Sequence, residues 1–187
     1  LCKVALWIEG HCAGFPLGFL DHHIKHGDSL VGVMDLKVLK DGIPEGAYES
    51  VTGDDKAAAR AYKKRNAAER ENVIQLTLSD VAGDVGVVDT FADQFQSLAS
   101  QEELSPDDVN AKEQLYEELR HGPKLEKLKN ACDLWTAAFF LPLVSSNEFK
   151  QEGVPTTQTI RQCLATNTVN GQLQGQVMAL SHTHPFF

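Results

Sequence analysis

The stretch KLEKLKNACDLWTAAFFLP, residues 124–142, constrains the fold of this 187-residue chain more than any other. Its large apolar side chains recur every three or four residues, at Leu125, Leu128, Cys132, Trp135 and Phe139. This spacing places them on one face of an α-helix. We therefore predict that this stretch forms the central helix of a hydrophobic core.

Most of the remaining chain also favours helices. Residues 105–122 place Ser105 at an N-cap position and Pro106 at the first helical position, and Gly122 and Pro123 follow as stop signals. Further helices are predicted over residues 1–9, 34–41, 54–76, 87–100, 156–165 and 170–180. The pattern has no βαβ alternation and no Gly-rich phosphate loop. By this pattern alone we predict a mainly α fold, in which the short apolar run 30–33 is a strand edge or a turn.

The charge balance limits the possible partners. The formal net charge is −9, with 26 acids against 17 bases, so a uniform surface of this chain would repel a polyanion. The densest basic patch lies in the predicted helix 54–76 and contains Arg60, Lys63, Lys64, Arg65 and Arg70. Two interpretations remain open: a solvated face with ion pairs within the helix, or a patch that contacts phosphates.

The cysteines and the hydropathy indicate a cytoplasmic protein without a membrane span. Cys2, Cys12, Cys132 and Cys163 form no Cys-x-x-Cys pair, so we expect reduced thiols that pack as small, buried hydrophobic groups. No apolar run reaches the roughly 18 residues of a membrane-spanning helix. The first residues also lack the pattern of a signal peptide.

The stretch FLDHHIKHGDSLVG, residues 19–32, combines three histidines with a Gly-Asp-Ser-Leu turn. His22, His23 and His26 have helical spacing that suits metal ligands, although the His-Glu-x-x-His motif is absent, and a polar loop with solvated imidazoles is the simpler interpretation. Ser29 resembles the nucleophile of a lipase turn, but no partner residues are recognisable. A third possibility is that the Asp28 carboxylate accepts a hydrogen bond from the amino group of an adenine, with Leu30 completing the pocket.

Three segments carry a family resemblance. LCKVALWIEGH, PLGFLDHHIKHGDSLVGV and GIPEGAYESVTGDDKAAARAYKKRNAAER resemble the interior of large bacterial adenine-specific DNA methyltransferases. These enzymes belong to single-chain restriction–modification and related phage-defence systems, and their long helical insertion contains a segment similar to ACDLWTAAFF. The resemblance is strongest over residues 1–70 and 131–140.

The resemblance implies a cofactor and a role for the turn. It implies that Asp28 binds the adenine amino group of S-adenosylmethionine, with Ser29 and Leu30 beside it, and the family also accommodates Asn at the Asp28 position. It further implies that Lys63, Lys64 and Arg65 are the candidate contacts to DNA. The Gly-rich cofactor loop and the Asn-Pro-Pro-aromatic motif of the family are missing, so we expect an internal segment that is inactive alone.

The resemblance also implies a domain division. Residues 1–35 would be part of the methyltransferase core, with a short strand remnant of its α/β sheet, and residues 36–187 would be a helical insertion domain. Partners would be DNA, the other domains of the same polypeptide and, through exposed core surface, a second copy. Such a segment should either dimerise through that surface or have weak packing over residues 1–35. The alternatives are a non-catalytic helical interaction module and a metal-dependent hydrolase.

Overall fold

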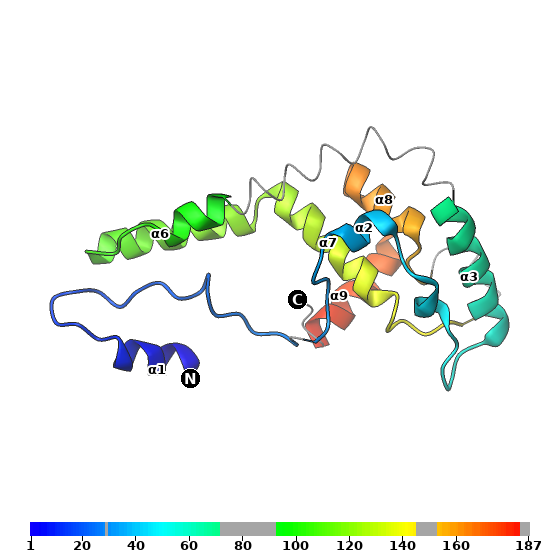
Figure 1. Cartoon of the computed structure of the whole chain (residues 1–187), viewed down its shortest axis with the longest axis horizontal. Helices are drawn as coiled ribbons and strands as arrows, with labels where there is room; N and C mark the ends of the chain where they lie inside the picture. Colours follow the sequence, from blue (N-terminus) through cyan, green and yellow to red (C-terminus); the bar gives the residue numbers. More distant parts are fainter. Residues whose placement is uncertain (29, 72–92, 145–152, 184–187) are drawn as a thin grey trace. The chain divides into compact units, whose positions relative to one another are not determined.

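The computed structural model describes residues 1–28, 30–71, 93–144 and 153–183 (Figure 1). These residues form a mainly helical structure, which confirms the predicted fold class. Its elements are α1 (Cys2–Glu9), α2 (Lys37–Asp41), the 3-10 helix η1 (Glu45–Tyr48), α3 (Lys56–Glu71), α6 (Pro106–Arg120), α7 (Pro123–Ala137), α8 (Thr157–Thr166) and α9 (Gly171–Thr183). Residues 93–99 are also helical.

The strand remnant is not confirmed, because the described residues form no strand. Residues 30–33 instead form a turn followed by bends. The rest of the predicted helix 54–76, beyond Glu71, and the first part of the helix 87–100 lie outside the described residues.

The chain divides into two compact units. The first unit contains Leu1–His26 and Ala82–Glu126, and the second contains Gly27–Val81 and Lys127–Phe187. The predicted domain boundary after residue 35 stays a prediction.

The first unit has a small core of three buried side chains, Phe19, Leu98 and Tyr116. A buried ion pair stands beside it, because Lys112 Nζ lies 2.7 Å from Glu103 Oε1 and the Lys112 side chain is only 4% exposed. The other oxygen of Glu103 accepts a hydrogen bond from the Phe19 backbone at 2.8 Å. One carboxylate therefore connects the loop after α1 to α6.

The start of α6 confirms the predicted N-cap. The Asp108 backbone donates to Ser105 Oγ at 3.3 Å, and the Ser105 backbone donates to Asp108 Oδ2 at 2.8 Å. This reciprocal capping box satisfies backbone donors that the first turn of a helix leaves unpaired. Pro123, which was predicted as a stop signal after this helix, is also the first residue of α7.

The second unit is built around α7, as predicted, but its buried face differs from the predicted one. The buried apolar residues there are Ala131, Leu134, Ala137 and Ala138, whereas Trp135 packs against the core only in part. Phe139 is 43% exposed, so its assignment to the core stripe is wrong. The reason is that α7 ends at Ala137, and a helical period cannot place a residue that lies beyond the helix.

Candidate cofactor turn and basic helix

Asp28 makes two hydrogen bonds with the backbone that follows it. Its Oδ1 accepts a hydrogen bond from the Leu30 backbone at 3.0 Å, and its carbonyl accepts from the Val31 backbone at 3.2 Å. Both Asp28 and Leu30 are exposed, and the Leu30 side chain is 89% exposed. The third predicted cofactor contact, Ser29, lies outside the described residues.

The chemistry open to this turn follows from the carboxylate. The contact with Leu30 uses one carboxylate oxygen, and an ionised carboxylate has two acceptor oxygens. Asp28 can therefore hold its own turn and still accept a hydrogen bond from an external amino group. An exposed Leu30 beside it offers an apolar surface suited to the face of a purine.

The basic side chains of α3 do not act as one group. Lys63 Nζ lies 3.3 Å from Glu45 Oε2, and Arg65 Nε lies 2.8 Å from Glu69 Oε1 one turn along the helix. Arg70 donates to the Asp41 carbonyl at 3.0 Å. Lys64 is exposed and, within the described part of the chain, forms no ion pair. The interpretation as a surface with ion pairs therefore holds for Lys63 and Arg65, and contact with phosphates stays a prediction.

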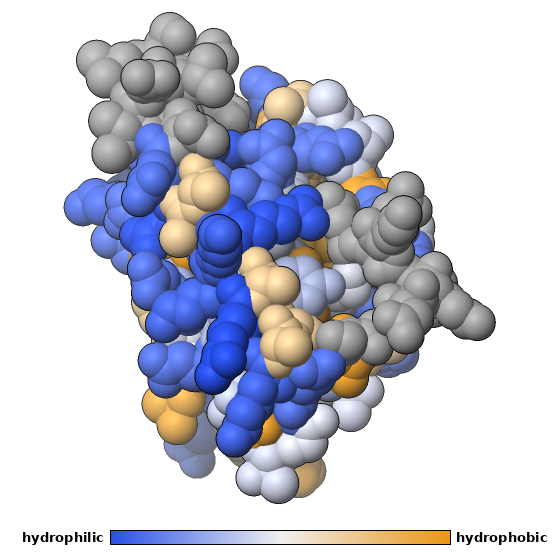
Figure 2. All heavy atoms as spheres, turned by 90° about the vertical axis from the view of Figure 1, so that its right-hand side faces the viewer, coloured by the Kyte–Doolittle hydropathy of each residue, from blue (hydrophilic) through white to orange (hydrophobic). Residues whose placement is uncertain are grey.

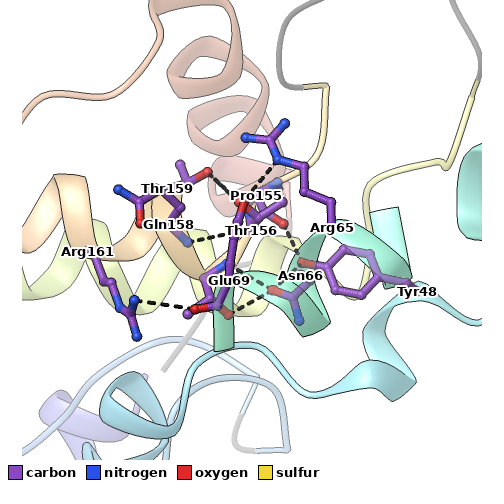
Figure 3. Close-up of polar contacts among 10 residues, drawn as sticks. Tyr48, Arg65, Asn66, Glu69, Pro155, Thr156, Gln158, Thr159 and Arg161 are labelled. Carbon is purple, nitrogen blue, oxygen red and sulfur yellow. Dashed lines mark hydrogen bonds and ion pairs between the residues drawn. The ribbon is translucent and has the colours of Figure 1, made fainter. Parts of the chain in front are cut away.

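A buried polar network fixes α3 against η1 and α8 (Figure 3). Asn66, which is fully buried, donates to the Ile43 carbonyl at 2.7 Å and accepts from the Thr157 backbone at 2.9 Å and from Thr157 Oγ1 at 2.7 Å. The Tyr48 hydroxyl donates to the Pro155 carbonyl at 2.7 Å. Burial raises the pKa of Tyr48 well above its ordinary value, so this hydroxyl remains a donor.

Further contacts join the same helix to the start of α8. Glu69 Oε2 accepts from the Gln158 backbone at 2.9 Å, and its carbonyl accepts from Arg161 at 3.5 Å (Figure 3). The sequence pattern did not predict this network of hydrogen bonds. Its only signal is an Asn among Ala, Lys and Arg in a strong helix-forming segment.

The histidines do not form a metal site in the described structure. Within residues 1–28, 30–71, 93–144 and 153–183, no group of three or more His, Cys, Asp or Glu side chains could hold a metal ion. His22 stacks on Phe19, with 5.5 Å between the ring centres, and both of its ring nitrogens are shielded from solvent. The expectation of a solvated imidazole is therefore wrong for His22. Burial, together with neighbouring His23 and Lys112, lowers its pKa and favours the neutral ring.

The cysteines fall into two classes. Cys163 is buried and Cys132 partly buried, and burial raises the pKa of these thiols to about 11 and about 12. Cys2 and Cys12 are exposed, so the expectation of four buried thiols is wrong for these two. They lie on and just after α1, which has no buried residue at all.

The apolar residues of α1 face solvent. Val4 is 50% exposed and Ile8 is 71% exposed, while Trp7 is partly covered and donates to the Gly18 carbonyl at 2.9 Å. Among the described residues of 1–35, only Phe19 is buried. The expectation of weak packing in this region is thus confirmed for these residues.

Searches of protein-family models, curated proteins and solved structures found no match to this chain. In the residues that the structure covers, every helix is too short or too polar to cross a membrane.

Proposed function

We propose that this chain is a segment of an S-adenosylmethionine-dependent DNA adenine methyltransferase of a bacterial restriction–modification or phage-defence system. The resemblance of its first 70 residues and of ACDLWTAAFF to that family carries the proposal. The intact protein would be the enzyme, working in the cytoplasm, and this segment alone would be inactive. It would contribute one wall of the cofactor pocket and a helical insertion domain.

The proposed role of Asp28, Ser29 and Leu30 is to bind the adenine of S-adenosylmethionine. Two observations support it: the Asp28 carboxylate is exposed with one oxygen engaged by its own turn, and the Leu30 side chain is open to solvent. The intact enzyme would transfer the methyl group to an adenine rotated out of the DNA duplex. We also propose DNA backbone contacts from Lys63, Lys64 and Arg65 on α3.

Calorimetry tests the cofactor proposal. S-adenosylmethionine is titrated into this chain and into a longer protein that includes the Gly-rich loop and the Asn-Pro-Pro motif. We expect binding in the longer protein, weakened about tenfold by Asp28→Ala, because one hydrogen bond to a charged acceptor is lost. Asp28→Asn should bind more tightly than Asp28→Ala, since the amide oxygen still accepts.

Asp35→Ala is the matched control. Asp35 also accepts a hydrogen bond from a backbone two residues on, at 2.9 Å from Lys37, and is also exposed. Both substitutions therefore remove the same kind of local contact. Equal binding by the Asp28 and Asp35 variants would argue against an adenine contact at Asp28.

A non-catalytic helical interaction module is the second candidate. The exposed apolar side chains of α1 favour it, because such a surface is typical of a helix that packs on another protein or domain. Failure of the longer protein to bind S-adenosylmethionine would favour this function over the first.

A further inference from the structure

A hollow of about 280 Å³ lies between the first half of α3 and the segment that follows η1. Its walls are formed by Tyr48, Glu49, Ser50, Lys56, Ala59, Arg60 and Lys63. In Figure 2 the side of Figure 1 that carries α3 faces the viewer, and strongly hydrophilic residues gather over it. The hollow lies at the surface of the second unit, and most of its lining residues are polar or charged.

The charges around the hollow follow from helix geometry. Lys56, Arg60 and Lys63 are separated by four and three residues, so they share one face of α3. Arg65 lies about 180° around the helix from Lys56, at 3.6 residues per turn, and pairs with Glu69 instead. The lining therefore has three cations against one acid, Glu49, in a chain whose net charge is −9.

The cationic groups in the hollow are side chains, not the end of the helix. Asp55 Oδ1 accepts from the backbones of Ala57 at 2.7 Å and Ala58 at 3.4 Å, so a carboxylate already occupies the N-terminus of α3. Lys56 and Arg60 are exposed, and the Lys63 side chain is 42% exposed. A ligand can therefore reach all three.

We propose that this hollow binds a backbone phosphate of DNA through Lys56, Arg60 and Lys63, with the Ser50 hydroxyl as an additional donor. Charge complementarity identifies the ligand, since three cationic side chains and a hydroxyl that line one hollow suit a phosphodiester. The choice of DNA rests on the proposed function. Because the contacts reach only phosphate, binding here is independent of base sequence and positions the duplex.

Glu45 competes with the phosphate. Its carboxylate holds Lys63 at 3.3 Å, and both side chains are partly exposed. A phosphate oxygen would replace that carboxylate as the partner of Lys63. Removing the charge of Glu45 should therefore strengthen DNA binding.

The test measures binding of a fluorescently labelled duplex to the full chain by anisotropy at several salt concentrations. Replacing Lys56, Arg60 and Lys63 by Gln should weaken binding about tenfold or more at low salt. It should also reduce the slope of log K against log salt by about one, because the slope changes by roughly one for each phosphate contact and the hollow holds one phosphate. The control replaces Lys37, Lys40 and Lys124 by Gln, which changes the net charge equally outside the hollow.

Glu45→Gln should change DNA affinity in the opposite direction, and a misfolded variant would not show tighter binding. It should tighten DNA binding about twofold to threefold, and more than Glu113→Gln, which removes an exposed charge on α6. Circular dichroism verifies that each variant keeps its helices.

Several outcomes would overturn the proposal. These are an equal loss in the control variant, an unchanged salt slope in the hollow variant, or binding to phosphatidylserine vesicles but not to DNA. None of them depends on S-adenosylmethionine. Failure of the hollow is therefore distinguishable from failure of the methyltransferase proposal, which the Asp28 variants test separately.

Discussion

At the scale of single residues, Gly42 shows how closely the second unit is packed. Its φ of +79° lies in a region that favours glycine, and a Cβ added there would stand 2.6 Å from both Oγ1 and Cγ2 of Thr157. Thr157 cannot move aside freely, because Oγ1 accepts from the Ile43 backbone at 3.0 Å and donates to Asn66. Gly42 thus allows the backbone after α2 to approach the start of α8.

We expect Gly42→Ala to lower the free energy of unfolding of the second unit by about 2–4 kcal/mol, from backbone strain plus overpacking. Urea unfolding followed by Trp135 fluorescence, in a chain whose Trp7 is replaced by Phe, measures it. Gly53→Ala separates the two causes, since Gly53 has a φ of +104° but open space around its Cβ. The control should lose only the strain, about 1–2 kcal/mol. Equal losses for both variants would show that the contact with Thr157 matters little.

At the scale of elements, Asn66 determines how α3 sits on its neighbours. Helix propensity explains why residues 56–71 are helical, since they are rich in Ala, Lys, Arg and Glu. Propensity does not determine which face turns inward. Asn66 does so by bonding to backbone groups of Ile43 and Thr157, and it thereby leaves Lys56 and Arg60 on the solvent side.

Asn66→Ala should destabilise the second unit by about 2–4 kcal/mol, because it leaves buried backbone groups without their partners. Chemical unfolding monitored by circular dichroism at 222 nm gives the value. Asn130→Ala is the matched control, since Asn130 makes one exposed side-chain contact with Asn167 at 3.3 Å. It should cost about 0.5 kcal/mol or less. A cost for Asn66→Ala as small as the control would contradict the role given to this residue.

At the scale of the whole molecule, the two units have unequal cores. Among the described residues, the core of the first unit has three buried apolar side chains, whereas that of the second has fifteen. Burial of one large apolar side chain contributes about 1.5–3 kcal/mol, which must offset the entropy of ordering the chain. Burial of apolar side chains therefore stabilises the first unit much less than the second.

We expect the first unit to unfold at lower denaturant than the second. Trp7 lies in the first unit and Trp135 in the second. Unfolding of the first unit is followed by Trp7 fluorescence in the Trp135→Phe variant, and unfolding of the second by Trp135 fluorescence in the Trp7→Phe variant. Each readout thus comes from a unit that keeps its own tryptophan. Transitions at the same denaturant concentration in the two variants would mean that the units unfold together.

Much of the local structure follows from the order of residues. The bounds of α1, α2, α6, α8 and α9 lie within three residues of the predicted helices, because caps, prolines and short-range spacing act over a few residues. The capping box of Ser105 and Asp108 is an example, because the sequence SPDD places an acid three residues after the N-cap serine. The turn at Asp28 and the basic character of α3 are likewise predicted by the local sequence.

What local pattern could not provide is which faces are buried and which distant groups meet. The hollow joins Ser50 to Lys56, Arg60 and Lys63, and the network around Asn66 joins residues about ninety positions apart in the chain. Shielding of His22 and exposure of Cys2 likewise depend on what packs against them. Periodicity describes one helix at a time, whereas burial and hydrogen bonding between elements arise only when several helices compete for the same core.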